Sequence, residues 1–132
     1  MGPPGLQSAL ARRSAKDPSP AFAAALSTGD LDAATACFAR DGCLLTADAT
    51  AIRGRADIRA VLGQLIAMSA LAEVEQRAIL VTGEVALATE CWTTRFLRSN
   101  GTTYARTAPT STVLRRVEDV WKLQIAAPWG WG

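Results

Sequence analysis

Residues 21–40 read AFAAALSTGDLDAATACFAR, and this stretch decides the fold because it predicts two helices in direct succession. Its first half carries apolar side chains at helical spacing and ends at Gly29. Asp30 then provides an N-cap for a second helix, which we expect to end at Asp41-Gly42. The short apolar segment CLLTA, residues 43–47, should form the first strand.

The chain continues with one more helix and then with strands alone. The third helix is expected after Gly54, where apolar residues recur at i, i+3, i+4 and i+7 as far as Met68. Strand character follows, interrupted by turn sequences, in residues 71–82, 84–98, 102–117 and 120–126. The order predicts an α+β domain, in which three helices from the N-terminal half pack on one face of a curved, mainly antiparallel sheet.

Length and charge limit the kinds of protein this chain can be. Its 132 residues, 49% of them hydrophobic, suffice for one folded domain. We expect that domain over residues 19–132, after a flexible tail at 1–18, because four of the six prolines fall within residues 1–20. A net charge of +2 argues against a nucleic-acid partner. Without a long apolar run or a secretory signal, the chain is expected in the cytoplasm and not in a membrane.

The residue types present restrict the chemistry. The chain has no histidine, and its three cysteines show no CxxC spacing, so we expect no metal site. Phosphate-binding glycine motifs are also missing, and we expect no cofactor. Any acid–base chemistry would have to use a carboxylate, a cysteine, a lysine or Tyr104.

The strand predicted over residues 84–98 has no consistently polar face. Alternation places Leu87, Thr89 and Cys91 on one side. Glu90, Trp92 and Phe96 lie on the other. Helices can cover only one side of the sheet in so small a domain, so we expect the side with Glu90, Trp92 and Phe96 to form the interface of a homodimer.

Several motifs together resemble the nuclear transport factor 2-like superfamily, which includes the ketosteroid isomerases and the SnoaL-like polyketide cyclases. The motifs are AFAAALSTGDLDAATACFARDG, IRGRADIRAVL, TGEVALATECWTTRF and STVLRRVEDVWKLQIAAPWG. The similarity extends from about Ser19 to Gly130. It implies a cone-shaped α+β barrel with a ligand pocket between the helices and the concave sheet face, and commonly a homodimer.

The isomerases' catalytic groups are missing from the matching positions. Phe22 stands where the resemblance expects an oxyanion-hole tyrosine, Thr46 where it expects the aspartate base, and Thr112 where it expects a second acid. Asp48 is the carboxylate nearest to the usual base position and is our candidate catalytic residue. The alternative is that Asp48 accepts backbone hydrogen bonds in a turn.

The resemblance and the strand alternation together define a candidate pocket. Arg106 would anchor a carboxylate, enolate or phenolate and Tyr104 would donate a hydrogen bond, unless both lie at a solvated strand edge. A bulge at Pro109 would move both to the other face. Trp129 would stack on a ligand or simply pack in the core. The candidate pocket residues are Phe22, Thr46, Leu87, Thr89, Cys91, Tyr104, Arg106, Thr110, Thr112 and Trp129.

Two further residues have competing interpretations. Glu90, in mid-strand among apolar neighbours, would be an acid or base if buried, or one half of an ion pair at the dimer interface. Cys91 would be a nucleophile or a small buried hydrophobe, and the lack of histidine favours the latter.

The sequence thus predicts a protein that binds a small hydrophobic molecule, either polyketide-like or steroid-like. It would then be a cofactor-free isomerase, cyclase or hydratase. The alternative is a non-catalytic ligand-binding or assembly module with the same fold, which the absence of the usual catalytic base favours. A toxin or effector domain is a third possibility.

Overall fold

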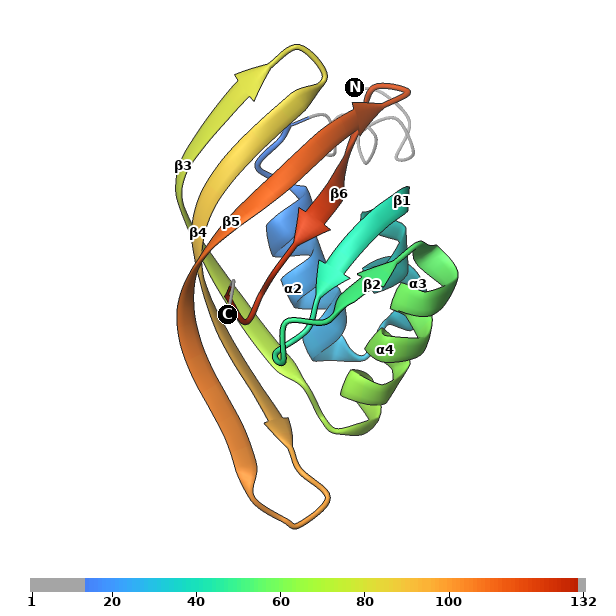
Figure 1. Cartoon of the computed structure of the whole chain (residues 1–132), viewed down its shortest axis with the longest axis vertical. Coiled ribbons are helices and arrows are strands. Elements are labelled where there is room, and N and C mark those ends of the chain that lie inside the picture. Colours follow the sequence, from blue (N-terminus) through green and yellow to red (C-terminus); the bar gives the residue numbers. More distant parts are fainter. Residues whose placement is uncertain (1–13, 131–132) are drawn as a thin grey trace, which may run out of the picture.

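Three helices lie on the concave side of one six-stranded sheet in the computed structural model, which describes residues 14–130 (Figure 1). The helices are α2 (Pro18–Thr28), α3 (Leu31–Ala36) and α4 (Arg55–Ala67). The strands are β1 (Phe38–Leu45), β2 (Ala51–Arg53), β3 (Leu71–Thr82), β4 (Val85–Leu97), β5 (Thr103–Val117) and β6 (Val120–Ala126). The predicted α+β class is confirmed.

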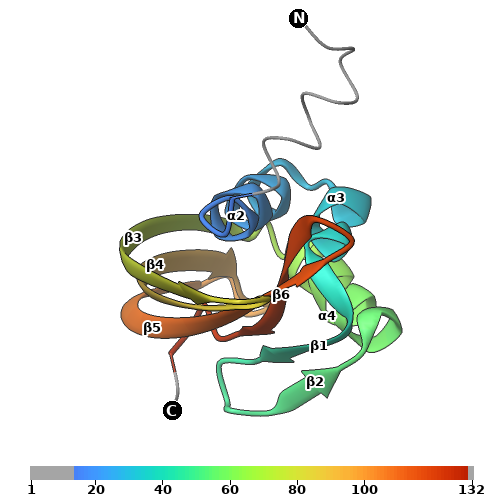
Figure 2. The ribbon, with the colours of Figure 1, turned by 90° about the horizontal axis from the view of Figure 1, so that it is seen from above.

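The sheet curves around the helices without closing into a barrel (Figure 2). Its strand order is β2-β1-β6-β5-β4-β3, so β2 and β3 are the two edges. Neighbouring strands run antiparallel except β1 and β6, which are parallel. Within residues 14–130, no helix is both long and apolar enough to cross a membrane.

The predicted junction between the first two helices is confirmed. Gly29 ends α2 in the left-handed conformation at φ 76°, which a glycine adopts without steric cost. Asp30 then caps α3 by accepting a hydrogen bond from the backbone N–H of Ala33 at 3.0 Å. Residues 1–13 of the predicted tail lie outside the described residues, whereas Ala15 is buried in the core.

The second helix is shorter than the sequence predicts. It ends at Ala36, and Phe38 already begins β1, where it pairs with Leu123 of the parallel strand β6. Gly42 lies inside β1 at an irregularity of this pairing and does not mark the end of a helix. A side chain at Gly42 would approach the backbone oxygen of Ala39 to 2.9 Å, so this irregularity requires glycine.

Aromatic packing joins α2 to both halves of the sheet. The Phe22 ring lies 5.1 Å from that of Phe38 on β1, edge to face, and 5.9 Å from that of Trp92 on β4. All three side chains are buried. Phe22 therefore sets where α2 sits over the concave face.

We expect Phe22→Ala to lower the free energy of unfolding by about 3–5 kcal/mol, because it removes a ring that two buried aromatic side chains contact. Phe22→Leu, which keeps most of the volume, should cost less. Urea unfolding of the two variants and the native protein measures the difference. Equal stability of Phe22→Ala and the native protein would contradict this account of the core.

Candidate functional site

The helix-covered face of β4 is the opposite of the one expected from the sequence. Glu90 and Trp92 point inward and are buried, so they do not lie at an outward dimer interface. Leu87, Thr89 and Cys91 lie on the outer face, outside the expected pocket. Strand alternation predicts correctly which residues share a face of β4. It does not predict which of the two faces is covered by the helices, because neither face is consistently polar. Trp92 lies on the helix-covered face because its ring packs against that of Phe22 on α2.

The inner face of β5 is as the alternation predicts. Tyr104, Arg106, Thr110 and Thr112 share this face, and the last two are buried. The pairing of β4 with β5 continues without a shift through Pro109, so no bulge moves these residues to the other side.

Glu90 is the central polar group of this inner face. Its side chain is 1% exposed. Three neutral side chains donate hydrogen bonds to its carboxylate. Oε1 accepts from the Trp92 indole N–H at 3.1 Å and from the Thr112 hydroxyl at 2.7 Å, and Oε2 accepts from the Gln76 amide at 2.8 Å. These bonds offset part of the cost of burying the carboxylate and fix its orientation.

Five buried side-chain polar groups lack hydrogen-bond partners within residues 14–130. Three of them are the hydroxyls of Thr94 and Thr110 and the indole N–H of Trp129, and the other two are the Ser19 hydroxyl and the amide oxygen of Gln124. Thr110 is the register partner of Glu90 on the neighbouring strand. Trp129 precedes Gly130, whose Cβ position would lie 3.4 Å from the Cβ of Ala108, between Arg106 and Thr110 on the inner face. The inner face therefore carries unused hydrogen-bonding capacity beside Glu90.

Asp48 lies away from this face, exposed in the turn that joins β1 to β2. Its carboxylate accepts a hydrogen bond from the hydroxyl of Thr46, which is half-buried. Hydrogen bonds from Thr46 and Thr50 hold the pKa of Asp48 below its ordinary value. This geometry fits the turn interpretation, while a catalytic role for Asp48 stays a prediction.

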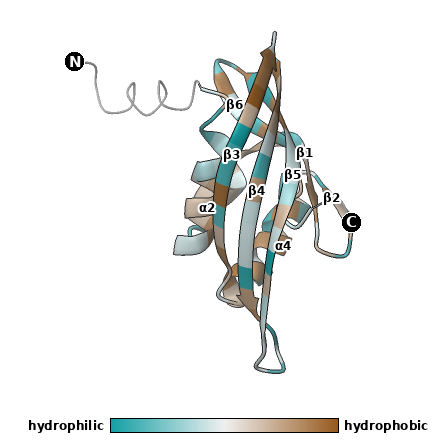
Figure 3. Ribbon diagram, turned by 90° about the vertical axis from the view of Figure 1, so that its left-hand side faces the viewer, coloured by the Kyte–Doolittle hydropathy of each residue, from teal (hydrophilic) through white to brown (hydrophobic). Residues whose placement is uncertain are grey.

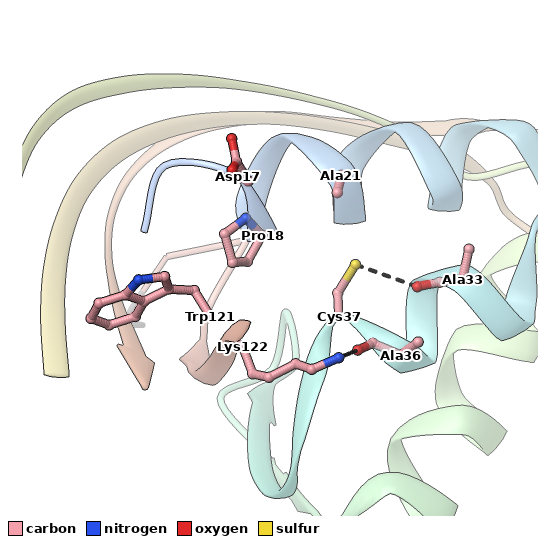
Figure 4. Close-up of a pocket in the computed structure, with 8 residues that line it drawn as sticks. All are labelled: Asp17, Pro18, Ala21, Ala33, Ala36, Cys37, Trp121 and Lys122. Atoms are coloured by element: carbon pink, nitrogen blue, oxygen red, sulfur yellow. Dashed lines mark hydrogen bonds between the residues drawn. The ribbon is translucent and has the colours of Figure 1, made fainter. Parts of the chain in front are cut away.

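A small pocket occupies the junction of α2, α3 and β6 (Figure 4). Its volume of about 20 Å³ admits little more than one water molecule. Two of its side chains bond to backbone oxygens of α3: Cys37 to Ala33 at 3.3 Å and Lys122 to Ala36 at 2.6 Å. This pocket is too small for an organic ligand.

The sequence predicts part of the inner site and misses the rest. The structure brings Phe22, Thr110, Thr112 and Trp129 together in the core with Glu90 and Trp92. Tyr104 and Phe96 are half-buried and their rings stack at 4.6 Å. Gln76 and Thr94 were not predicted. Gln76 pairs with Glu90 next to a register shift in β3, and that irregularity disrupts the alternation by which Gln76 could have been found.

Comparison with known proteins agrees with this architecture. The SnoaL-like domain matches residues 20–123, most of the chain. The chain belongs to the SnoaL-like domain family. No curated protein matches this SnoaL-like protein. Its fold is similar to that of an NTF2-like protein with a cystatin-like fold from Novosphingobium aromaticivorans, with a TM-score of 0.72 and 19% identity over 93% of this chain and 83% of that one.

Two further solved structures resemble the SnoaL-like protein to the same degree. A ketosteroid isomerase-like protein from Erwinia carotovora atroseptica has a TM-score of 0.72 and 15% identity over 85% of this chain and 89% of that one. A "putative dehydratase" of the NTF2-like family from Streptomyces avermitilis has a TM-score of 0.71 and 17% identity over 92% and 97%. At such identities the likeness shows the fold alone.

We expect Glu90→Leu to lower the free energy of unfolding by about 2–4 kcal/mol, because it leaves three donors without an acceptor. Glu90→Gln should stay within about 1 kcal/mol of the native value, since its amide oxygen replaces Oε1 and the Gln76 amide can rotate. Chemical unfolding of both variants measures the effect. A Leu variant as stable as the native protein would show that these hydrogen bonds contribute nothing.

Proposed function

We propose that this SnoaL-like protein binds a hydrophobic organic molecule on its inner face and acts on it without a cofactor, with Glu90 as general base. The observation that carries the proposal is a fully buried carboxylate, held by neutral donors, opposite the Thr110 hydroxyl, which has no partner within residues 14–130. Isomerisation, cyclisation and dehydration all need a proton taken from one atom and returned to another. One oriented carboxylate can do both.

The two carboxylate oxygens of Glu90 accept different numbers of hydrogen bonds. Oε1 accepts two bonds, from Trp92 and Thr112, whereas Oε2 accepts one, from Gln76. Oε2 therefore has more capacity to take a proton from a carbon next to a substrate carbonyl. The hydroxyl of Thr110, opposite Glu90, has no partner in the described part of the chain and could bond to an oxygen of the substrate.

The substrate would take the place of Trp129. This side chain is 3% exposed, and it belongs to the segment that follows β6, in which the Cβ position of Gly130 lies 3.4 Å from Ala108 on the inner face. Its indole N–H has no partner within residues 14–130, so no hydrogen bond from that group opposes its displacement. A flat, largely apolar molecule, polyketide-like or steroid-like, fits a space that an indole ring fills.

The alternative is a non-catalytic ligand-binding or assembly module. It is favoured by the same hydrogen bonds, because each oxygen of Glu90 already accepts at least one. In that case Glu90 would orient the three strands that supply its partners. The relative from Streptomyces avermitilis, which is named a "putative dehydratase", favours the catalytic proposal.

Exchange of carbon-bound hydrogen separates the two functions. We expect the native protein to accelerate deuterium incorporation into 2-tetralone, a hydrophobic bicyclic ketone, in D₂O. Glu90→Gln should reduce the acceleration by about 10²–10⁴-fold while binding persists, because the base is lost. Asp48→Asn, which alters only the exposed turn, is the matched control. Mass spectrometry follows the exchange, and calorimetry follows binding.

The outcomes are distinct. Exchange that survives in Glu90→Gln contradicts its role as base. Loss of exchange in Asp48→Asn alone would assign that role to Asp48. Binding of 2-tetralone without exchange by the native protein would support the non-catalytic module.

We also propose that the protein forms a homodimer through the outer face of β3, β4 and β5 (Figure 3). Leu80, Leu87 and Val113 are successive register partners across these strands. Leu80 is 68% exposed and Leu87 46%. The next outward positions along β4, Thr89, Cys91 and Thr93, are uncharged. A second copy would cover this row symmetrically.

Leu87→Asp should convert the dimer to a monomer, because it places a charge in the middle of the apolar row. Ala60→Asp adds the same charge on the exposed side of α4 and should leave the dimer intact. Size-exclusion chromatography with light scattering gives the mass of each. A native protein that is monomeric at micromolar concentration would refute the proposed interface.

A further inference from the structure

We infer that the substrate of the inner-face site is a hydrophobic organic acid whose anionic group binds Arg106. This inference rests on the proposed function and specifies the substrate class. Arg106 lies on the inner face of β5, and its register partner on β4 is Thr94. One nitrogen of its guanidinium, Nη2, lies 3.5 Å from the position that a Cβ on Gly130 would occupy. The cation is thus directed along the segment that holds Trp129.

Arg106 differs from the other half-buried arginines of residues 14–130. Arg55 donates to the backbone oxygen of Phe38 at 2.7 and 3.0 Å, and Arg116 forms two hydrogen bonds with Glu84. Arg106 has no hydrogen bond or ion pair to any described residue. A partly buried cation loses hydration that no group of residues 14–130 replaces, so an anionic ligand would be favourable.

The side chain opposite Arg106 is also suited to an anionic oxygen. The Thr94 hydroxyl is buried and has no partner within residues 14–130. A hydroxyl can donate a hydrogen bond. A carboxylate offers two oxygens with about four acceptor sites, enough for the guanidinium and this hydroxyl.

The surrounding charge also favours an anion. Between Glu90 and Glu118 the chain has five arginines and neither aspartate nor glutamate. Arg115 and Arg116 lie at the far end of β5, where they pair with Asp41 and Glu84. Arg95, Arg98 and Arg106 lie at the end of the hairpin near Tyr104, and the positive potential of these three would attract an acid there.

The aromatic residues beside Arg106 indicate the chemistry of the rest of the substrate. Tyr104, two residues away on the same face, stacks on Phe96 at 4.6 Å, and the Arg98 guanidinium lies 5.4 Å from its ring centroid. In the other direction, Arg106 and Thr110, the partner of Glu90, are four residues apart, about 13 Å along an extended strand. This spacing suits a body of two or three fused rings between the acid group and the reacting carbon.

A matched pair of probes tests the inference. 2-Naphthoate and 2-naphthamide have the same ring system, and only the first is an anion. We expect calorimetry to show naphthoate binding at least about tenfold more tightly to the native protein, the effect of a charge-assisted hydrogen bond. Arg106→Gln should abolish the preference and leave the affinity for naphthamide unchanged. Chemical-shift changes at the amides of Thr94 and Thr110 should accompany binding.

Two further variants serve as controls. Arg95→Gln removes the same charge from the outer face of the same hairpin and should keep the preference. Arg106→Lys keeps a cation without the planar fork and should keep part of it. Thermal unfolding confirms that each variant is folded.

Three outcomes would overturn the inference. If the native protein binds both probes equally, or Arg106→Gln retains the preference, the acid class is wrong while the proposed function stands. If Arg106→Lys and Arg106→Gln both bind naphthamide but neither differs from the native protein toward naphthoate, Arg106 is not the anchor. If neither probe binds the native protein, both proposals fail.

Discussion

The contact of the Phe22 ring with Phe38 and Trp92 decides which face of the sheet becomes the interior. Successive side chains of a strand point to opposite faces, so fixing Trp92 inward also fixes Glu90 inward and Leu87 outward. Because β4 and β5 pair without a register shift, Thr110 and the other residues of β5 on the same face also point inward. Both the buried carboxylate and the outer apolar row are consequences of one aromatic contact.

The sequence predicts the helices and strands of this fold better than it predicts which face of each strand is buried. The stop at Gly29, the cap at Asp30 and the helix after Gly54 are local signals, and each is found where predicted. The end of α3 is not, because Phe38 gains more from pairing with Leu123 in β6 than from extending a short helix. That partner lies 85 positions further along the chain, beyond the reach of local patterns.

In the candidate site, too, local sequence patterns predict some residues, while others are placed by contacts between distant strands. Strand alternation predicts the shared face of Arg106, Thr110 and Thr112, since β5 has a regular pattern. It cannot choose between the two faces of β4, where apolar and polar residues occur on both. It also misses Gln76, because the register shift between Gln76 and Ala78 interrupts the alternation in β3. The hydrogen bonds of Glu90 come from three different strands, so only the assembled sheet shows them.

The inner face keeps its acid and its cation apart. Glu90 and Arg106 lie on neighbouring strands, but their register partners, Thr110 and Thr94, separate them by two inward positions. An ion pair between them would satisfy both charges and leave little for a ligand. Instead Glu90 is held by neutral donors, while buried groups on Thr94, Thr110 and Trp129 have no partner within residues 14–130. A molecule with a carbonyl near Thr110 and Glu90 and an anion near Arg106 would satisfy groups that residues 14–130 leave unpaired.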